Sequence, residues 1–115
     1  MKTIANINFD DTIRVLYKIK EQKGHKTLQE TYKYLGDPNL EIDGILSTIS
    51  ISYNLAHKDA PLDEEGLQEL FAEKQIGIAK IAFIYKELIE SIMFDGTTEE
   101  ERKNMMAQAE KMSKK

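Results

Sequence analysis

Two histidines are the residues of this chain best suited to metal binding or to acid–base chemistry. His25 lies among lysines, and His57 stands beside Lys58 and Asp59. A protein metal site needs several ligands at a defined spacing, and neither histidine has a second histidine or a carboxylate at ligand spacing within its own predicted element. The sequence therefore predicts no metal site. A surface or helix-capping role for both histidines is the simpler interpretation.

Three groups of neighbouring acids could also do chemistry, but each falls at a predicted helix start. They occupy residues 10–11, 63–65 and 99–101. Carboxylates at these positions are explained by the helix dipole, which favours anions at the N-terminus. No glycine-rich loop has phosphate-binding spacing, and no nucleophile motif supports a Ser-His-Asp arrangement, which sequence alone does not exclude. We therefore expect a protein that is not an enzyme and that binds no cofactor.

The composition favours one small helical domain. The chain has 115 residues, a net charge of -4, a pI near 5.2 and no cysteine. The absence of cysteine excludes disulfides and thiolate metal sites, and it suits a reducing cytoplasm. The acidic balance argues against a nucleic-acid surface, which is normally basic. The first residues, MKTIANINFDD, lack the apolar core of a signal peptide.

Residues 75–94, the longest apolar segment, are predicted to form the central helix. Four charges interrupt the segment, which excludes a membrane span. Ile76, Phe83 and Phe94 fall on its polar side, so that either a second layer of the same chain or another protein must cover them. Both alternatives remain open. The apolar stripe of this helix consists of Ile78, Ile81, Ala82, Tyr85, Leu88, Ile89 and Ile92.

Residues 42–58 are predicted to form a second central helix, packed against the first. The alternation of Ile49, Ile51 and Tyr53 with serines resembles a strand, but the apolar residues also fit a helical stripe over four turns, and the length favours a helix. Residues 3–9 alternate weakly, with Ala5, Ile7 and Phe9 on one side and Ile4 on the other, which suggests a short strand or an extended arm. Either Asp10 or Asp11 is expected to cap the next helix.

That first helix is expected to present one apolar face and to end at Gly24. The face consists of Ile13, Leu16, Tyr17 and Lys20. Thr27 begins a second short helix with a capping box, and Asp63 is the expected cap of a third.

The chain changes character after Gly96. A second capping box at Thr98 begins a helix whose narrow apolar stripe contains Met105, Met106, Ala109 and Met112. Methionine adapts to apolar partners of varied shape, although the helix could equally fold back on its own core. We therefore predict an all-α domain of five or six helices with little or no β structure. Residues 1–95 form the core, and residues 96–115 form a C-terminal amphipathic helix or arm. The candidate partner-binding residues are Ile76, Phe83, Phe94, Met105, Met106 and Met112.

A small helical DNA-binding regulator is the alternative from another class. A lysine cluster in the first third of the chain supports it, but the short helix after Thr27 offers few side chains for base edges, and the chain as a whole is acidic. The cluster consists of Lys18, Lys20, Lys23, Lys26 and Lys33.

Residues 45–71 contain a helix ending in YNLAHKD (53–59), an acidic helix start in APLDEE (60–65), and the apolar helix LQELF (67–71). In this pattern the chain resembles the tail assembly chaperones of long-tailed bacteriophages (siphoviruses), most closely those from phages of lactococcal-type hosts. The resemblance covers about half of the chain. Many members of the family have a clearer pair of N-terminal strands, and the sequence departs from the family there.

The resemblance implies a non-enzymatic role. Such chaperones bind the long, apolar, helix-rich tape measure protein in the host cytoplasm. They keep it soluble until tail tube subunits polymerise around it, and they are absent from the mature virion. It also implies self-association into rings or spirals and adds the tail tube protein as a further candidate partner. Neither nucleic acid nor a membrane is expected as a partner.

Overall fold

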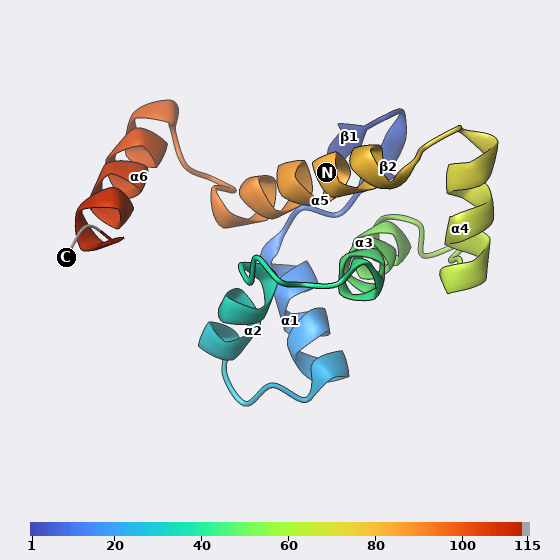
Figure 1. The fold of residues 1–115 in the computed structure, drawn as a ribbon, viewed down its shortest axis with the longest axis horizontal. Helices are drawn as coiled ribbons and strands as arrows, with labels where there is room; N and C mark the ends of the chain where they lie inside the picture. Colours follow the sequence, from blue (N-terminus) through green and yellow to red (C-terminus); the bar gives the residue numbers. More distant parts are fainter. Residues whose placement is uncertain (114–115) are drawn as a thin grey trace.

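The computed structural model describes residues 1–113, apart from the side chains at positions 109, 110, 112 and 113. A β-hairpin opens the chain and six helices follow it within the described residues (Figure 1). The mostly helical fold that the sequence predicts is therefore confirmed. The strands are β1 (Lys2–Ile4) and β2 (Ile7–Phe9), and the helices are α1 (Ile13–Lys23), α2 (Leu28–Leu35), α3 (Ile42–Ala56), α4 (Glu64–Glu73), α5 (Ile78–Met93) and α6 (Glu99–Ser113).

The hairpin replaces the single strand or extended arm expected for residues 3–9. β1 and β2 are antiparallel, with Ile4 opposite Ile7, and a two-residue turn joins them. Both turn residues, Ala5 and Asn6, have positive φ angles of 53° and 61°, as the turns favoured in tight hairpins require. The turn places Ile4, Ile7 and Phe9 together in the core. The weak alternation had suggested that Ile4 faces the other way.

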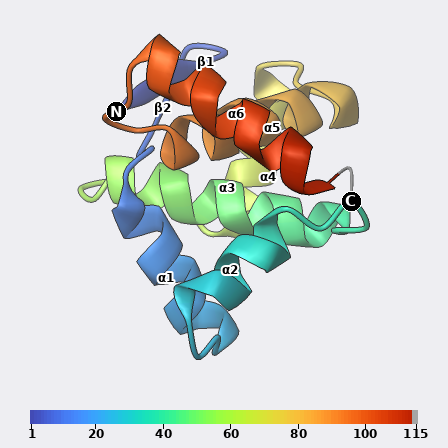
Figure 2. The same ribbon diagram turned by 90° about the vertical axis from the view of Figure 1, so that its left-hand side faces the viewer.

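The two long helices α3 and α5 pack together at the centre, as predicted, and the hairpin contacts both. Figure 2 shows α3 between the α1–α2 pair on one side and α5 on the other. Ile49 of α3 and Ile84 and Leu88 of α5 are fully buried. Ile78, the expected first member of the α5 stripe, is 73% exposed because the helix only begins there.

Helix α1 buries a different face from the predicted one. Val15 and Ile19 are fully buried, while Ile13 and Tyr17 are more than half exposed. The N-cap is Thr12, not Asp10 or Asp11. The Thr27 and Asp63 caps and the left-handed Gly24 terminus are all confirmed.

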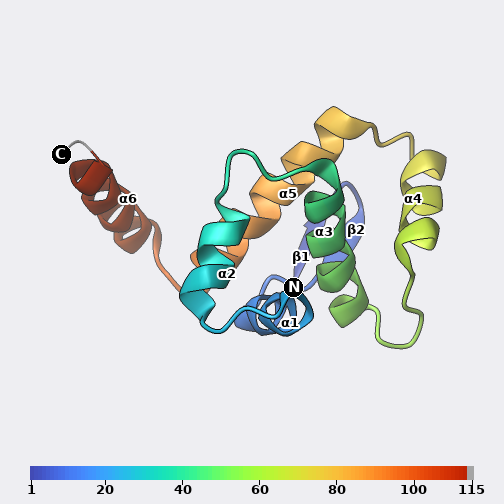
Figure 3. The same ribbon diagram turned by 60° about the horizontal axis from the view of Figure 1, so that its bottom comes forward.

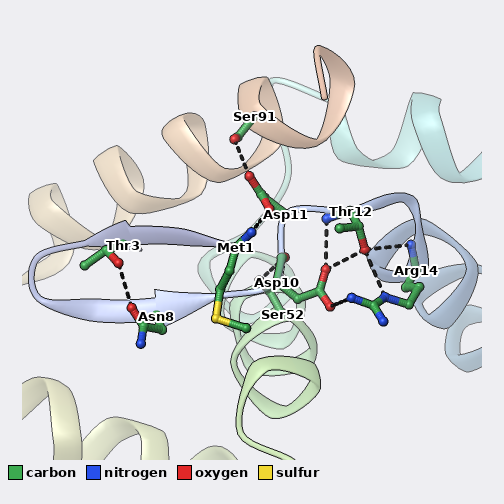
Figure 4. A network of polar contacts seen from close by, with 9 residues as sticks. All are labelled: Met1, Thr3, Asn8, Asp10, Asp11, Thr12, Arg14, Ser52 and Ser91. Carbon is green, nitrogen blue, oxygen red and sulfur yellow. Dashed lines mark hydrogen bonds and ion pairs between the residues drawn. The ribbon is translucent and has the colours of Figure 1, made fainter. Parts of the chain in front are cut away.

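The two aspartates fasten the hairpin to α3 and α5 instead of capping α1 (Figure 4). Asp10 accepts hydrogen bonds from the amide and hydroxyl of Thr12, and its other oxygen lies 3.0 Å from Arg14. The Ser52 hydroxyl donates to the Asp10 carbonyl at 2.6 Å, and the Asp10 amide donates to the Ser52 carbonyl. The sequence shows the two acids, but it does not indicate partners such as Ser52, which lies 42 positions away in the chain.

Asp11 makes the second half of this fastening. Its carboxylate accepts a hydrogen bond from Ser91 of α5 at 2.8 Å and lies 3.1 Å from the Met1 amino group. Burial raises the pKa of Asp11, but the Ser91 hydrogen bond, the Met1 ammonium group and a backbone hydrogen bond together outweigh burial. The net pKa lies below its ordinary value.

Helix α6 stands apart from the rest of the molecule in two separate views (Figure 1 and Figure 3). The chain turns at Gly96, whose φ of 80° is left-handed, before α6 begins. The radius of gyration is 14.7 Å, compared with about 13 Å for a compact chain of this length. The described part of the chain thus has a body and a projecting helix that begins at Glu99.

Candidate partner-binding surfaces

An apolar groove lies where the C-terminal half of α5 passes α1 and α2. Its volume is about 280 Å³, slightly below the ~300–1,000 Å³ usual for small-molecule sites. It therefore suits the side chains of a partner protein better than a whole small molecule. The residues that line it are Leu16, Tyr32, Leu35, Gly36, Ile89, Ile92 and Met93.

A tyrosine of α5 joins this helix to the end of α2. The Tyr85 hydroxyl donates a hydrogen bond to the Leu35 carbonyl at 2.8 Å, which joins the end of α2 to α5. Burial, with a smaller effect from nearby Tyr34, raises the pKa of Tyr85 above its ordinary range. Tyr85 therefore stays protonated and keeps donating at any ordinary pH.

Exposed apolar side chains extend the groove outward. Tyr32 is 55% exposed and Met93 is 41% exposed. Ile13 lies one turn before Leu16 on α1 and is 55% exposed, whereas the exposed Tyr17 borders a separate hollow with Lys20 and His25. Together Tyr32, Met93, Ile13 and the groove form an apolar surface that the described part of the chain leaves uncovered.

The three candidates on or next to α5 do not form one surface. Ile76 is partly buried against the core, so the chain itself supplies its cover. Phe83 is 46% exposed, with the Lys80 ammonium 4.6 Å from its ring centre. Phe94 is partly buried, and the Arg102 guanidinium lies 4.8 Å from its ring centre. Of the three, Phe83 has the most exposed ring.

The methionine candidates lie on the arm. Met105 and Met106 are 47% and 52% exposed, while the side chain of Met112 lies outside the described residues. Arg102 holds the first turn of α6 against α5 through a hydrogen-bonded ion pair with Glu90 at 3.0 Å. The methionines therefore project from an arm that is fastened at its base.

Charge is unevenly distributed along the chain. Residues 12–36, which contain α1 and α2, carry six basic and two acidic side chains, a net charge of +4. Residues 37–73, which contain α3 and α4, carry nine acidic side chains and one basic side chain, a net charge of -8. The apolar groove thus adjoins the basic pair of helices in an acidic protein.

The histidines make structural contacts. His25 Nδ1 lies 2.9 Å from the Thr31 hydroxyl. His57 stacks on the Tyr53 ring, and its Nε2 donates to the Asn8 carbonyl at 3.0 Å. Among the described residues no three His, Asp or Glu side chains gather as a metal ion would require. Within residues 1–113 no helix combines the length and the apolar character needed to cross a bilayer.

Compared with models of known protein families, with curated proteins and with solved structures, the chain shows no match.

Proposed function

We propose that this chain is a phage tail assembly chaperone that binds the apolar, helix-rich tape measure protein. The observation that carries the proposal is the uncovered apolar surface around the groove between α1, α2 and α5. A helical partner can lay an apolar face into a groove of this kind. The resemblance over residues 45–71 supplies the identity of the partner.

Two further features support the proposal. The N-terminal strand pair that many members of the family possess is present as the β1–β2 hairpin, so the departure inferred from sequence disappears. The exposed methionines of α6 provide a second adaptable apolar surface. In this proposal the protein works in the host cytoplasm before the tail tube polymerises, self-associates, and is absent from the mature virion.

Co-expression with a tape measure protein tests the proposal. The chaperone should keep the tape measure protein in the soluble fraction and co-purify with it. Met93→Glu places a charge beside the groove and should return the tape measure protein to the pellet. Binding should weaken about tenfold or more, because a central interface side chain contributes about 1–2 kcal/mol or more.

Ile78→Glu is the matched control, since Ile78 is 73% exposed and lies at the other end of α5. Fifteen residues separate the two positions, or about 22 Å at 1.5 Å per residue. Ile78→Glu should leave the tape measure protein soluble. A tape measure protein that is equally insoluble with and without the parent chaperone would refute the proposed function.

A small DNA-binding regulator remains the second candidate because of one observation. Helices α1 and α2 are joined by a four-residue turn that contains Gly24, and residues 12–36, which contain them, carry a net charge of +4. Helix-turn-helix readers have such a turn. A shift of duplex DNA that weakens steeply with added salt would favour this reading. If duplex DNA is not shifted even at low salt, the DNA-binding candidate is excluded.

A further inference from the structure

The chain contains two aspartates that are followed directly by glycine, the dipeptide that rearranges to isoaspartate most readily because glycine has no side chain to hinder the reaction. One is Asp43–Gly44 in the first turn of α3, and the other is Asp95–Gly96 in the link between α5 and α6. We propose that Asp95–Gly96 is a site of spontaneous isomerisation to isoaspartate, whereas Asp43–Gly44 is protected by its packing. This modification site is independent of the proposed function.

The reaction uses only the chain and water. The amide nitrogen of Gly96 attacks the protonated side-chain carboxyl group of Asp95. An N–C bond forms, and the amide proton and the carboxyl hydroxyl group leave together as water, which gives a succinimide ring. Water then adds to one of the two ring carbonyls and breaks its bond to the nitrogen. If that carbonyl is the main-chain one, the chain continues through the Asp95 side chain and the former main-chain carbonyl becomes a free carboxylate.

Asp95 and Gly96 are the two central residues of an exposed turn. The amide and the hydroxyl of Thr97 both donate hydrogen bonds to the Phe94 carbonyl, at 3.0 and 2.6 Å. The φ of 80° at Gly96 fits the second central position of a type II turn. Both central residues are exposed, so neither is held by the core.

Ring closure requires the peptide unit between Asp95 and Gly96 to rotate until the nitrogen meets the carboxyl carbon. Nothing packs against the turn at this point, since a Cβ built on Gly96 would meet no atom within 4 Å. Local opening of an exposed link costs little free energy compared with opening a packed helix. The link therefore reaches the reactive geometry easily.

The same rotation at Asp43–Gly44 is obstructed by packing. Gly44 is partly buried, and a Cβ built on it would lie 2.7 Å from a methyl carbon of Leu40 and 2.8 Å from the Tyr34 hydroxyl. Both side chains thus lie directly against the Gly44 backbone. Rotating this peptide unit would displace them and break the first turn of α3. The two pairs are alike in sequence, and the fold distinguishes them.

Isomerisation at Asp95 should loosen the arm formed by α6. It adds one carbon atom to the main-chain path between the Phe94 carbonyl and the Thr97 amide, so the two hydrogen bonds that close the turn lose their register. The contacts of Arg102 with Glu90 and with the Phe94 ring then remain to hold the first turn of α6.

Ageing the full chain in warm neutral buffer, followed by tryptic peptide mapping, tests the inference. Trypsin cuts after lysine and arginine, so the two pairs fall in separate peptides, residues 34–58 and 87–102. Isoaspartate has the same mass as aspartate, but electron-transfer fragmentation breaks its backbone at a different bond and identifies it. We expect isoaspartate to accumulate several-fold faster at Asp95 than at Asp43.

Two controls accompany the measurement. Asp95→Glu keeps the charge but lengthens the side chain by one carbon, which disfavours ring closure, so its peptide 87–102 should stay unmodified. The parent chain aged in urea should form isoaspartate at both positions at similar rates, because the packing that protects Asp43 is then lost.

Two results would overturn the inference. One is equal accumulation at Asp43 and Asp95 in the folded protein. The other is an unmodified Asp95 in the folded protein under conditions in which the unfolded chain forms isoaspartate there. Hydrogen exchange of fresh and aged protein checks the effect on the arm, since exchange should become faster in α6 and stay unchanged in α3. Unchanged exchange in α6 would contradict the loosening of the arm.

Discussion

Replacing Ser52 by alanine should destabilise the protein through one hydrogen bond. The Ser52 side chain is fully buried, and its hydroxyl donates to the carbonyl of Asp10, which is 2% exposed. Alanine fills nearly the same space but leaves the Asp10 carbonyl without this donor. An unsatisfied buried polar group costs about 1–3 kcal/mol. We therefore expect the free energy of unfolding to fall by that amount.

The expected change in melting temperature follows from chain length. With an unfolding entropy of about 2.1 cal/mol/K per residue, 115 residues give about 0.24 kcal/mol/K. A loss of about 1–3 kcal/mol therefore lowers the melting temperature by about 4–12 °C. Thermal unfolding followed by circular dichroism at helix wavelengths measures this shift.

Ser50→Ala is the matched control. Ser50 lies on the same helix, is only partly buried and lines an open surface hollow. Both substitutions gain the same helix propensity, about 0.5 kcal/mol, so their difference isolates the Ser52 hydrogen bond. If Ser52→Ala melts at the same temperature as Ser50→Ala, the hydrogen bond from the Ser52 hydroxyl contributes nothing to stability and the reasoning fails.

Three further predictions concern the core, the loss of stability at acid pH and the arm. Ile49→Ala should reduce the free energy of unfolding by about 2–5 kcal/mol, measured in urea, because Ile49 is fully buried; a loss under 1 kcal/mol would contradict the central packing. The pKa of Asp11 is lower in the folded protein than in the unfolded chain, so ionised Asp11 stabilises the fold at pH values above the unfolded pKa of about 3.9. This stabilisation is lost as the pH falls through the lower pKa of the folded protein. Asp11→Asn should therefore be less stable than the parent at pH 7 and should lose less stability on acidification, whereas parallel pH curves would refute this. Deleting residues 98–115 should leave a folded body with weakened assembly, measured by melting and by sedimentation, and an unfolded product would show that the arm belongs to the core.

The long helices were predictable because their apolar periodicity is strong over many turns. The face of α1 was not, since that helix carries two apolar stripes. Ile13, Leu16 and Tyr17 make the larger stripe, but Val15 and Ile19 are the residues that face the core. Choosing between stripes depends on the shape of α3 and the hairpin, which the sequence of α1 does not contain.

The hairpin and the groove escaped prediction for different reasons. Tight hairpin turns are usually signalled by glycine after asparagine or aspartate, whereas this turn uses Ala5 and Asn6. The groove combines residues from α1, α2 and α5, which lie far apart in the sequence. Its apolar members look like ordinary core residues in the sequence. Only their packing reveals that Tyr32 and Met93 remain open to solvent.

A single residue sets the direction in which the arm leaves the body. Gly96 has a φ of 80°, and a side chain built on it would meet no atom within 4 Å. A substitution such as Gly96→Ala therefore meets only backbone strain, about 1–2 kcal/mol in the left-handed region. Arg102 fastens the first turn of α6 to Glu90 on the far side of this turn, so the strain would fall on the short link between Phe94 and Glu99 or on that ion pair. Gly96 therefore allows a tight link and a fastened arm to coexist, and its replacement would loosen the arm at its base before it disturbed the body.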